Sequence, residues 1–303
     1  MKIHFWALIL LLTHSLLLLT SQAAQADILY KYYNLNTSVS ERDSAVKRPL
    51  ILWIHGCRQK VDTFVAVTDI VEKTKSLNPI IIAPYQDSKL NVLKCWNFFS
   101  DEMQKRDGEF MEVIKEIQKH IDSGEADPER IFIGGFSSGA IFAQHLTLCF
   151  PEIFKAALLH SGGPFDYNKA MDSKEGVATG AKEALACAST NLSQRKLKNI
   201  LYFHGKKDHI LPWKSGLSGF AQAVHYFDLN DDAEANNSFE FKQSRDQEKL
   251  DMAVKFPDGT ALEFVRIENM SHRWSGSRPG SAFSSPETMS SVDAFLNMTN
   301  NLK

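Results

Sequence analysis

The stretch that decides the fold is Ile131-Phe132-Ile133-Gly134-Gly135-Phe136-Ser137-Ser138-Gly139-Ala140. Its apolar start predicts a buried strand, and residues 140–148 predict a helix directly after it. Between them, residues 135–139 fit the pattern G-x-S-x-G, in which a serine occupies a sharp turn from strand to helix. The glycines are needed because flanking side chains would meet the backbone there. This context predicts Ser137 as a nucleophile; an inert serine in an ordinary turn is the alternative.

Outward from this turn, strand and helix patterns alternate along the chain. Residues 50–54 form a continuous apolar run, as in buried parallel strands, and residues 109–121 place apolar side chains on one helical face. The alternation predicts the α/β class, with a mostly parallel central sheet and helices on both faces. The other expected strands are 28–33 (at an edge), 79–83, 130–134, 154–159, 200–203, 254–256 and 261–267, and the other expected helices are 62–77, 212–226 and 286–298.

Three further stretches are expected to be loops or turns. The Gly/Ser/Ala-rich region between strands 154–159 and 200–203 predicts a loop, and the polar stretch 228–251 predicts an excursion on the surface. Pro257-Asp258-Gly259-Thr260 predicts a hairpin turn. Since no Pro/Gly/Ser-rich linker divides the chain, we expect a single domain over residues 27–303.

The composition is that of an ordinary globular protein. Hydrophobic residues make up 44% of the 303 residues and charged residues 23%, with a formal net charge of −2. No strong field therefore draws the chain to nucleic acid, and we expect no nucleic-acid partner.

The N-terminus has the pattern of a secretory signal peptide. Lys2 precedes an apolar run over residues 5–19, and Ala24-Gln25-Ala26 matches the small-x-small cleavage pattern. We expect residues 1–26 to be removed and the protein to be secreted or periplasmic, without stable membrane insertion. An uncleaved anchor is the alternative, but the run is shorter than the roughly 20 residues that span a bilayer.

The four cysteines, Cys57, Cys95, Cys149 and Cys187, all follow the expected cleavage site. An even number of cysteines in an oxidising compartment favours disulfides, and four cysteines allow three connectivities. None has the close paired spacing of a zinc site, so we expect no metal.

A nucleophilic serine needs a base, and the base needs an orienting carboxylate. Asp208 comes shortly after the expected strand 200–203, and His272 comes shortly after the expected strand 261–267. Ser137, Asp208 and His272 therefore stand in the order serine, acid, histidine of the α/β-hydrolase fold. Asp208 and His272 both lie at carboxyl ends of strands, where open α/β sheets bind ligands. Taken singly, each could be an ordinary loop residue. His160 and His204 are interpreted as structural histidines at strand ends.

Other aspartates fit the role of the acid less well, because they lie in the polar excursion (Asp228, Asp231, Asp232) or in the hairpin turn (Asp258). An acyl-transfer site also needs donors for an oxyanion. In this fold they are the N–H after the nucleophile, here that of Ser138, and one from an early strand-end loop. His55-Gly56-Cys57 follows strand 50–54, and the Cys57 N–H is our choice for the second donor.

Several segments together resemble the polyhydroxybutyrate depolymerase and feruloyl esterase family of secreted α/β-hydrolase esterases. The Cys after His-Gly and the Cys-Trp-Asn element are the most specific of them. The matching segments are Trp53-Ile54-His55-Gly56-Cys57, Cys95-Trp96-Asn97-Phe98-Phe99, Asp127-Pro128-Glu129-Arg130, Phe136-Ser137-Ser138-Gly139-Ala140, His160-Ser161-Gly162, Phe203-His204-Gly205-Lys206-Lys207-Asp208 and Ser271-His272-Arg273-Trp274-Ser275-Gly276.

The resemblance implies a triad of Ser137, Asp208 and His272 that needs no cofactor or metal. It also implies a Cys57–Cys95 bond, which leaves Cys149 and Cys187 as the second pair. The chain departs from the family at Trp213, where many relatives look more polar. No threonine-rich linker or polymer-binding domain follows His272, so a soluble ester or oligomer is expected at least as much as solid polyester.

Trp96, Trp213 and Trp274 lie near the predicted catalytic segments and could form an apolar wall for an acyl group or aromatic ring. Ordinary packing at the bases of loops is the alternative. The function expected from the whole sequence is an exported serine carboxylester hydrolase acting on polyhydroxyalkanoate oligomers, feruloyl or acetyl esters, or other short-acyl esters. A serine peptidase of the same fold and a non-catalytic binding protein on this scaffold are the alternatives.

Overall fold

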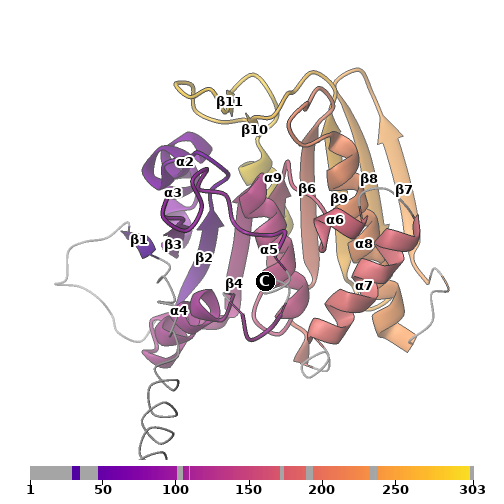
Figure 1. Ribbon diagram of the computed structural model, residues 1–303, viewed down its shortest axis with the longest axis horizontal. Helices are drawn as coiled ribbons and strands as arrows, with labels where there is room; N and C mark the ends of the chain where they lie inside the picture. The colour runs from indigo at the N-terminus through magenta and orange to yellow at the C-terminus, as the bar shows by residue number, and fades with distance from the viewer. Residues whose placement is uncertain are drawn as a thin grey trace, which may run out of the picture.

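The computed structural model describes residues 29–34, 47–100, 105–108, 110–170, 174–188, 194–232, 236 and 238–300. At its centre is a nine-stranded sheet with the order β1-β3-β2-β4-β5-β6-β9-β8-β7 (Figure 1). The strands from β3 to β9 in this order are parallel, and β1 pairs antiparallel with β3 at one edge. At the other edge β8 is antiparallel to β9, and β7 is antiparallel to β8. The strands are β1 Leu29–Asn34, β2 Arg48–Ile54, β3 Ile80–Tyr85, β4 Ala126–Phe136, β5 Ala156–His160, β6 Asn199–Gly205, β7 Glu240–Arg245, β8 Lys249–Lys255 and β9 Ala261–Ile267.

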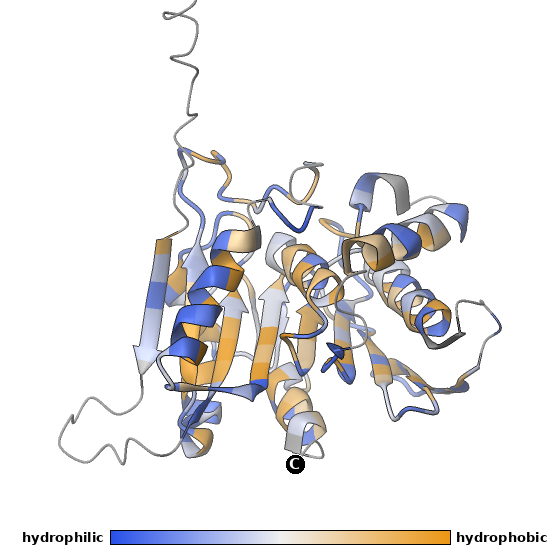
Figure 2. Cartoon of the chain, turned by 90° about the horizontal axis from the view of Figure 1, so that it is seen from below, coloured by the Kyte–Doolittle hydropathy of each residue, from blue (hydrophilic) through white to orange (hydrophobic). Residues whose placement is uncertain are grey.

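Helices cover both faces of this sheet, because alternate residues of the central strands point to opposite sides. Leu50 and Leu52 of β2 pack in a core with α4, α5, α7 and α8, whereas Ile51 and Trp53 pack in a second core with α2, α3 and α9. Figure 2 shows the apolar strands between helices whose outer faces are hydrophilic. The helices are α2 Val61–Thr68, α3 Ile70–Lys73, η2 Lys75–Leu77, α4 Phe110–Asp122, α5 Ser138–Cys149, α6 Tyr167–Ala170, α7 Lys174–Ala188, α8 Trp213–Asp232 and α9 Ser291–Asn300.

The predicted α/β class and every predicted strand are confirmed within the described residues, which exclude Ile28. The edge position of β1 and the hairpin between β8 and β9 are also as predicted. The expected helix 62–77 is divided into α2, α3 and η2, since Asp69 has the left-handed backbone that ends α2. The final helix begins at Ser291, later than predicted.

The region between β5 and β6 contains α6 and α7, so the prediction of a loop there is wrong. Small residues dominate α7, and those that are buried include Gly180, Ala181 and Ala184. A Cβ at Gly180 would lie 2.0 Å from Nε2 of Gln222 on α8. The small residues let α7 pack closely on α8, and a composition typical of loops therefore marks a helix contact here.

The polar stretch 228–251 is also more regular than predicted. Helix α8 continues to Asp232, and β7 adds an edge strand paired with β8. All six residues of β7 are exposed. Polar and charged edge strands of this kind protect a sheet from pairing with other chains, and they lack the apolar alternation from which strands are predicted. A short parallel pair, β10 Trp274–Ser275 and β11 Ser284–Ser285, was also not predicted.

Candidate active site

Ser137 occupies the strand-to-helix turn that its sequence pattern predicts, between β4 and α5. Its φ of 57° and ψ of −124° are a sparsely populated conformation for a residue with a side chain. A Cβ at Gly135 would lie 2.3 Å from the carbonyl oxygen of Gly139, and one at Gly139 would lie 2.3 Å from that of His55. Close backbone contacts on both sides therefore require the two glycines and hold the serine on a sharp turn.

The side chains of Ser137, His272 and Asp208 form one hydrogen-bonded chain. Ser137 Oγ lies 3.0 Å from His272 Nε2, and His272 Nδ1 lies 2.6 Å from Asp208 Oδ2. With these partners, Nδ1–H donates to the carboxylate and Nε2 accepts from the serine hydroxyl. All three residues are buried. Asp208 follows β6 and His272 follows β9, which are neighbours in the sheet. The upper edge of the sheet in Figure 1, under the chain that carries β10 and β11, is where these strands end.

Gly205 brings the aspartate and histidine loops together. A Cβ at this residue would lie 2.2 Å from the carbonyl oxygen of Met270, in the loop that carries His272. The amide of Lys207 donates to the same carbonyl oxygen at 2.9 Å. The absence of a side chain at Gly205 is therefore part of what places Asp208 against His272.

Asp208 accepts further hydrogen bonds besides that of His272. Its Oδ1 accepts from the amides of Ile210 and Leu211, both at 2.9 Å. His204 Nε2 lies 3.3 Å from Oδ2 and 2.8 Å from the carbonyl oxygen of Leu211, so its N–H is shared between two acceptors. Burial alone would raise the pKa of Asp208, but the hydrogen bonds from His204 and His272 outweigh it and lower that pKa well below its ordinary value.

The predicted oxyanion loop lies directly beside Ser137. A Cβ at Gly56 would be 2.9 Å from the Cβ of Ser137, and the Ser138 hydroxyl is 3.3 Å from Cys57 Sγ, to which it donates because the disulfide sulfur has no proton. Within the described part of the chain, neither the Cys57 amide nor the Ser138 amide donates to a protein acceptor. Both predicted donors are therefore next to the serine and available.

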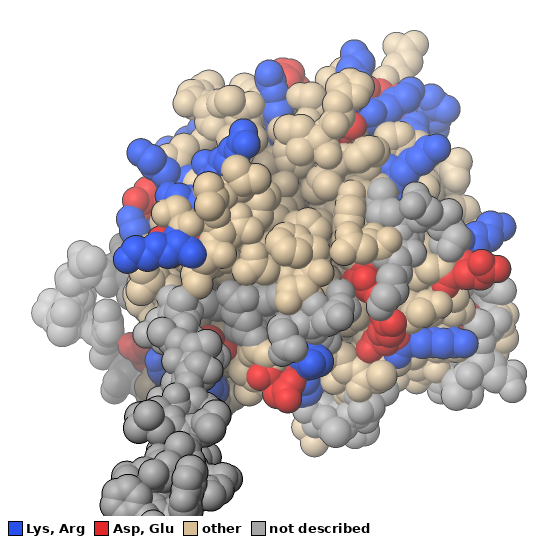
Figure 3. Space-filling view, in the orientation of Figure 1, with Lys and Arg blue, Asp and Glu red and all other residues tan. Residues whose placement is uncertain are grey.

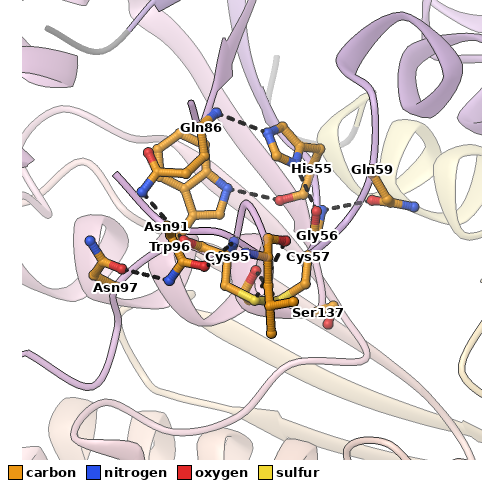
Figure 4. The surroundings of a disulfide bond; sticks show 12 residues. His55, Gly56, Cys57, Gln59, Gln86, Asn91, Cys95, Trp96, Asn97 and Ser137 are labelled. Carbon is orange, nitrogen blue, oxygen red and sulfur yellow. Dashed lines mark hydrogen bonds between the residues drawn. A yellow bond between two sulfur atoms is a disulfide. The ribbon is translucent and has the colours of Figure 1, made fainter. Parts of the chain in front are cut away.

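A hydrogen-bond network that the sequence analysis missed fixes this loop (Figure 4). The Gly56 amide donates to Gln59 Oε1 at 2.7 Å, and Trp96 Nε1 donates to the His55 carbonyl oxygen at 2.8 Å. His55 Nδ1 donates to the Gly56 carbonyl oxygen at 2.7 Å, and its Nε2 accepts from the Gln86 amide at 3.2 Å. Burial lowers the pKa of His55 to about 4, so the ring is neutral and can use one nitrogen as donor and the other as acceptor.

Both disulfides implied by the family resemblance are present. Cys57–Cys95 joins the oxyanion loop to the loop after β3, and Cys149–Cys187 joins the end of α5 to α7. The first bond lies against the site, as Figure 4 shows, and the second lies at the far end of the helix that begins next to Ser137.

Two of the three tryptophans predicted to line the substrate site belong to the packed core instead. Trp96 is fully buried and stacks on Phe142 with 4.7 Å between ring centres. Trp274 is 1% exposed and stacks on His160 at 4.7 Å. Neither presents a surface to a substrate in this structure, because neighbouring side chains enclose each indole. Trp213, at the start of α8, is half-buried, and its contact with substrate stays a prediction.

His160 has the structural role that its sequence position suggested. The ring is fully buried, and its Nε2 lies 3.1 Å from the Ser275 amide, from which it accepts a hydrogen bond. Burial lowers its pKa well below the ordinary value, so it is neutral. Among the described residues, no group of His, Cys, Asp and Glu side chains could hold a metal ion, and no helix is long and apolar enough to cross a membrane.

The family model and the curated relatives that match this chain are described as esterases or depolymerases. A family model described as Esterase PHB depolymerase matches residues 35–211, more than half of the chain. Poly(3-hydroxyalkanoate) depolymerase C of Paucimonas lemoignei is 26% identical over 127 residues, which are 41% of this chain and 30% of that protein. Feruloyl esterase B of Thermothelomyces thermophilus is 23% identical over 138 residues, 45% of this chain and 43% of that protein. The matches span less than half the length of these curated relatives.

Solved structures extend the likeness to the fold. An acetyl xylan esterase from Aspergillus awamori superimposes with a TM-score of 0.63 at 18% identity, over 83% of this chain and 89% of that one. A thermophilic esterase from Thermogutta terrifontis gives a TM-score of 0.55 at 13% identity, over 93% and 92% of the two chains. The predicted α/β-hydrolase fold is thereby confirmed. The family match ends at residue 211, so it includes Ser137 and Asp208 but not His272.

Proposed function

Because this chain belongs to the Esterase PHB depolymerase family, we propose that it is an exported serine carboxylester hydrolase with Ser137 as its nucleophile. The observation that carries the proposal is the hydrogen-bonded chain from Ser137 Oγ through His272 to Asp208. A serine hydroxyl is a weak nucleophile until an adjacent base accepts its proton, and the base must be held in one tautomer. The contacts of His272 meet both requirements.

The proposed reaction is acyl transfer in two steps. His272 accepts the proton of Ser137 as Oγ attacks the ester carbonyl carbon, and the amides of Cys57 and Ser138 stabilise the negative oxygen that results. His272 then gives its proton to the departing alcohol oxygen, which leaves an acyl-enzyme. Water attacks this ester with His272 again as base, and the carboxylic acid is released. Asp208 stays ionised and stabilises the imidazolium in both steps.

The substrate belongs in the proposal only as a class. The relatives are described as acting on polyhydroxyalkanoate, feruloyl or acetylxylan esters, and we extend to this chain short-acyl esters and ester oligomers of those kinds. The chain over residues 27–303 is proposed to be one catalytic domain. Export rests on the signal-peptide pattern of residues 1–26, which lie outside the described residues, and is supported by the two disulfides.

A substrate panel with an active-site variant tests the proposal. The wild-type protein should hydrolyse p-nitrophenyl acetate, butyrate and ferulate, and S137A should lower kcat on the order of 10⁴-fold or more while the fold is retained by circular dichroism. Peptide p-nitroanilides should be poor substrates. Faster hydrolysis of the anilides would favour the peptidase alternative, and absence of any Ser137-dependent hydrolysis would favour a binding protein.

A further inference from the structure

A cleft opens beside the oxyanion loop, between α2 and the chain segment just before β11. Its volume is about 340 Å³. We call it the α2 cleft. The residues that line it include Arg58, Gln59, Lys60, Phe64, Val67 and Phe283.

The α2 cleft adjoins the triad through two of its lining residues. Gln59 accepts the amide hydrogen of Gly56, where an added Cβ would lie 2.9 Å from the Cβ of Ser137. On the other side, the ring of Phe283 lies 6.1 Å from that of Phe136, the residue before the serine. The triad residues themselves do not line the cleft. A substrate group in it would therefore be several bonds away from the reacting carbonyl.

The lining of the cleft combines cations with an apolar floor. Phe64 is 2% exposed and Val67 8%, so they form a closed apolar base. Arg58 and Lys60 are exposed, and none of the described residues that line the cleft is acidic. Within the described chain neither cation makes an ion pair. Two unpaired cations over an apolar floor are complementary to a hydrocarbon chain that ends in an anion.

The other loops around the site have the same sign of charge. Residues 55–60, 86–97, 206–212 and 268–285 follow β2, β3, β6 and β9 and carry eight Lys or Arg but three Asp or Glu, although the whole chain has a net charge of −2. Figure 3 shows blue side chains prevailing along the upper part of the molecule. Two of these cations are paired, Lys206 with Glu268 and Arg278 with Asp69. An electropositive rim raises the local concentration of anionic substrates.

We propose that the α2 cleft binds a free carboxylate on the acyl chain of the substrate, so that the enzyme prefers esters that carry a remote carboxylate. Arg58 and Lys60 contact the carboxylate, and Phe64, Val67 and Phe283 contact the chain that leads to it. Arg58 is well placed for this, because it directly follows Cys57 and its amide donates to the Leu93 carbonyl oxygen at 2.7 Å. The inference rests on the proposed esterase function and assigns its substrate class.

A matched pair of substrates isolates the carboxylate. The p-nitrophenyl monoester of adipic acid and p-nitrophenyl hexanoate have acyl chains of equal length and differ in the terminal group. Each kcat/KM is divided by the uncatalysed rate in the same buffer, which removes differences in intrinsic reactivity. The wild-type protein should favour the adipate ester about tenfold or more, and raising NaCl from 0.05 to 0.5 M should reduce this preference because salt screens charge pairs.

The double variant R58Q/K60Q should lose about tenfold of the preference and most of its salt dependence. K242Q, which removes an exposed lysine on β7, is the control and should keep both. A preference near one in the wild-type protein, or an unchanged preference in R58Q/K60Q, would overturn the inference. Hydrolysis of the hexanoate ester by wild type but not by S137A would show that only this inference, and not the esterase function, had failed.

Discussion

Asp208 accepts four hydrogen bonds, two from backbone amides and two from histidines. Because both carboxylate oxygens accept hydrogen bonds, the carboxylate stays charged and keeps one orientation toward His272. His204 contributes one of the four and is buried, so it is more than the strand-end histidine that the sequence indicated. Its N–H also holds the Leu211 carbonyl oxygen, and with it the turn in which Asp208 lies.

Removing the His204 donor should weaken the site without removing any member of the triad. In H204L the pKa of Asp208 should rise because one stabilising hydrogen bond is lost, and kcat should fall about tenfold with a smaller change in KM. The loss should be similar at pH 5 and at pH 8, since the pKa of Asp208 begins well below its ordinary value and the carboxylate stays ionised at both pH values.

The matched variant is H204Q, which places an amide N–H where the imidazole N–H is and should recover part of kcat. Steady-state kinetics from pH 4.5 to 8.5 on both variants measures this. If H204L, shown to be folded by circular dichroism, kept the wild-type kcat and pH profile, His204 would have no positioning role.

The sequence was sufficient to identify the three residues of the chain Ser137–His272–Asp208, since each follows an apolar strand and their order is diagnostic. It was not sufficient for the residues that support them. Gln59 and Gln86 have no motif of their own, and their partners are backbone groups that approach only after the loops fold. The burial of Trp96 could not be read from its position beside Cys95 for the same reason.

At the scale of elements, the two disulfides allow the effect of a bond on activity to be separated from its effect on stability. Each joins cysteines 38 residues apart, but only Cys57–Cys95 lies against the oxyanion loop. In the chain-entropy model, loops of equal length contribute equal stability, here about 4 kcal/mol each. A difference in activity between the two deletions therefore reports on positioning rather than on stability.

We expect C57A/C95A and C149A/C187A to lose similar free energies of unfolding, measured by urea denaturation. Only C57A/C95A should also lower kcat, by about tenfold or more, because its loop carries a proposed oxyanion donor. Ester hydrolysis is to be measured at a temperature where both variants are folded. Equal kcat losses in the two variants, or none in C57A/C95A, would contradict a positioning role for this bond.

Elements with a periodic or continuous pattern of apolar residues could be predicted from the sequence. Helix α7 and strand β7 lack such a pattern and were not predicted. The alanines and glycines of α7 resemble a loop in composition, and only their contact with α5 and α8 reveals a helix. The side chains of β7 are all exposed, so nothing in its residues distinguishes a polar edge strand from a surface loop. Pairing with β8 decides its structure, and pairing depends on distant sequence.

At the scale of the whole molecule, neutral histidines in the interior connect stability to pH. Burial lowers the pKa of His55 and of His145 to about 4, against 6.5 in the unfolded chain. Between these values the unfolded chain binds more protons than the folded protein. The histidines therefore do not reduce stability above pH 6.5, and the free energy of unfolding falls as the pH drops from 6.5 toward 4.

Each of these two histidines should lower the free energy of unfolding by about 2 kcal/mol between pH 7 and pH 5. H145N removes one of them, and its side-chain amide lies near the position of His145 Nδ1, which donates to the Ile141 carbonyl oxygen. This variant should be less stable at pH 7 but lose about 2 kcal/mol less on acidification, as measured by urea denaturation at both pH values. A pH dependence equal to that of wild type would contradict the buried neutral state of His145.

The sequence also predicted the architecture of the whole molecule, because parallel strands buried on both faces need continuous apolar runs and intervening helices. The strand order could not be derived in the same way. It places β4, with the serine, two strands from β6 and three from β9, and the loops after them close the remaining distance. That closure turns three separate motifs into one site.

Active-site labelling with a fluorophosphonate tests the nucleophile most directly. The probe reacts with serine hydroxyls that a neighbouring base has activated, so it depends on the whole chain of contacts from Asp208 to Ser137. We predict one adduct per molecule by intact mass, located by peptide mapping on Ser137, and none in S137A. An unlabelled wild-type protein, or the same adduct in S137A, would contradict the central claim.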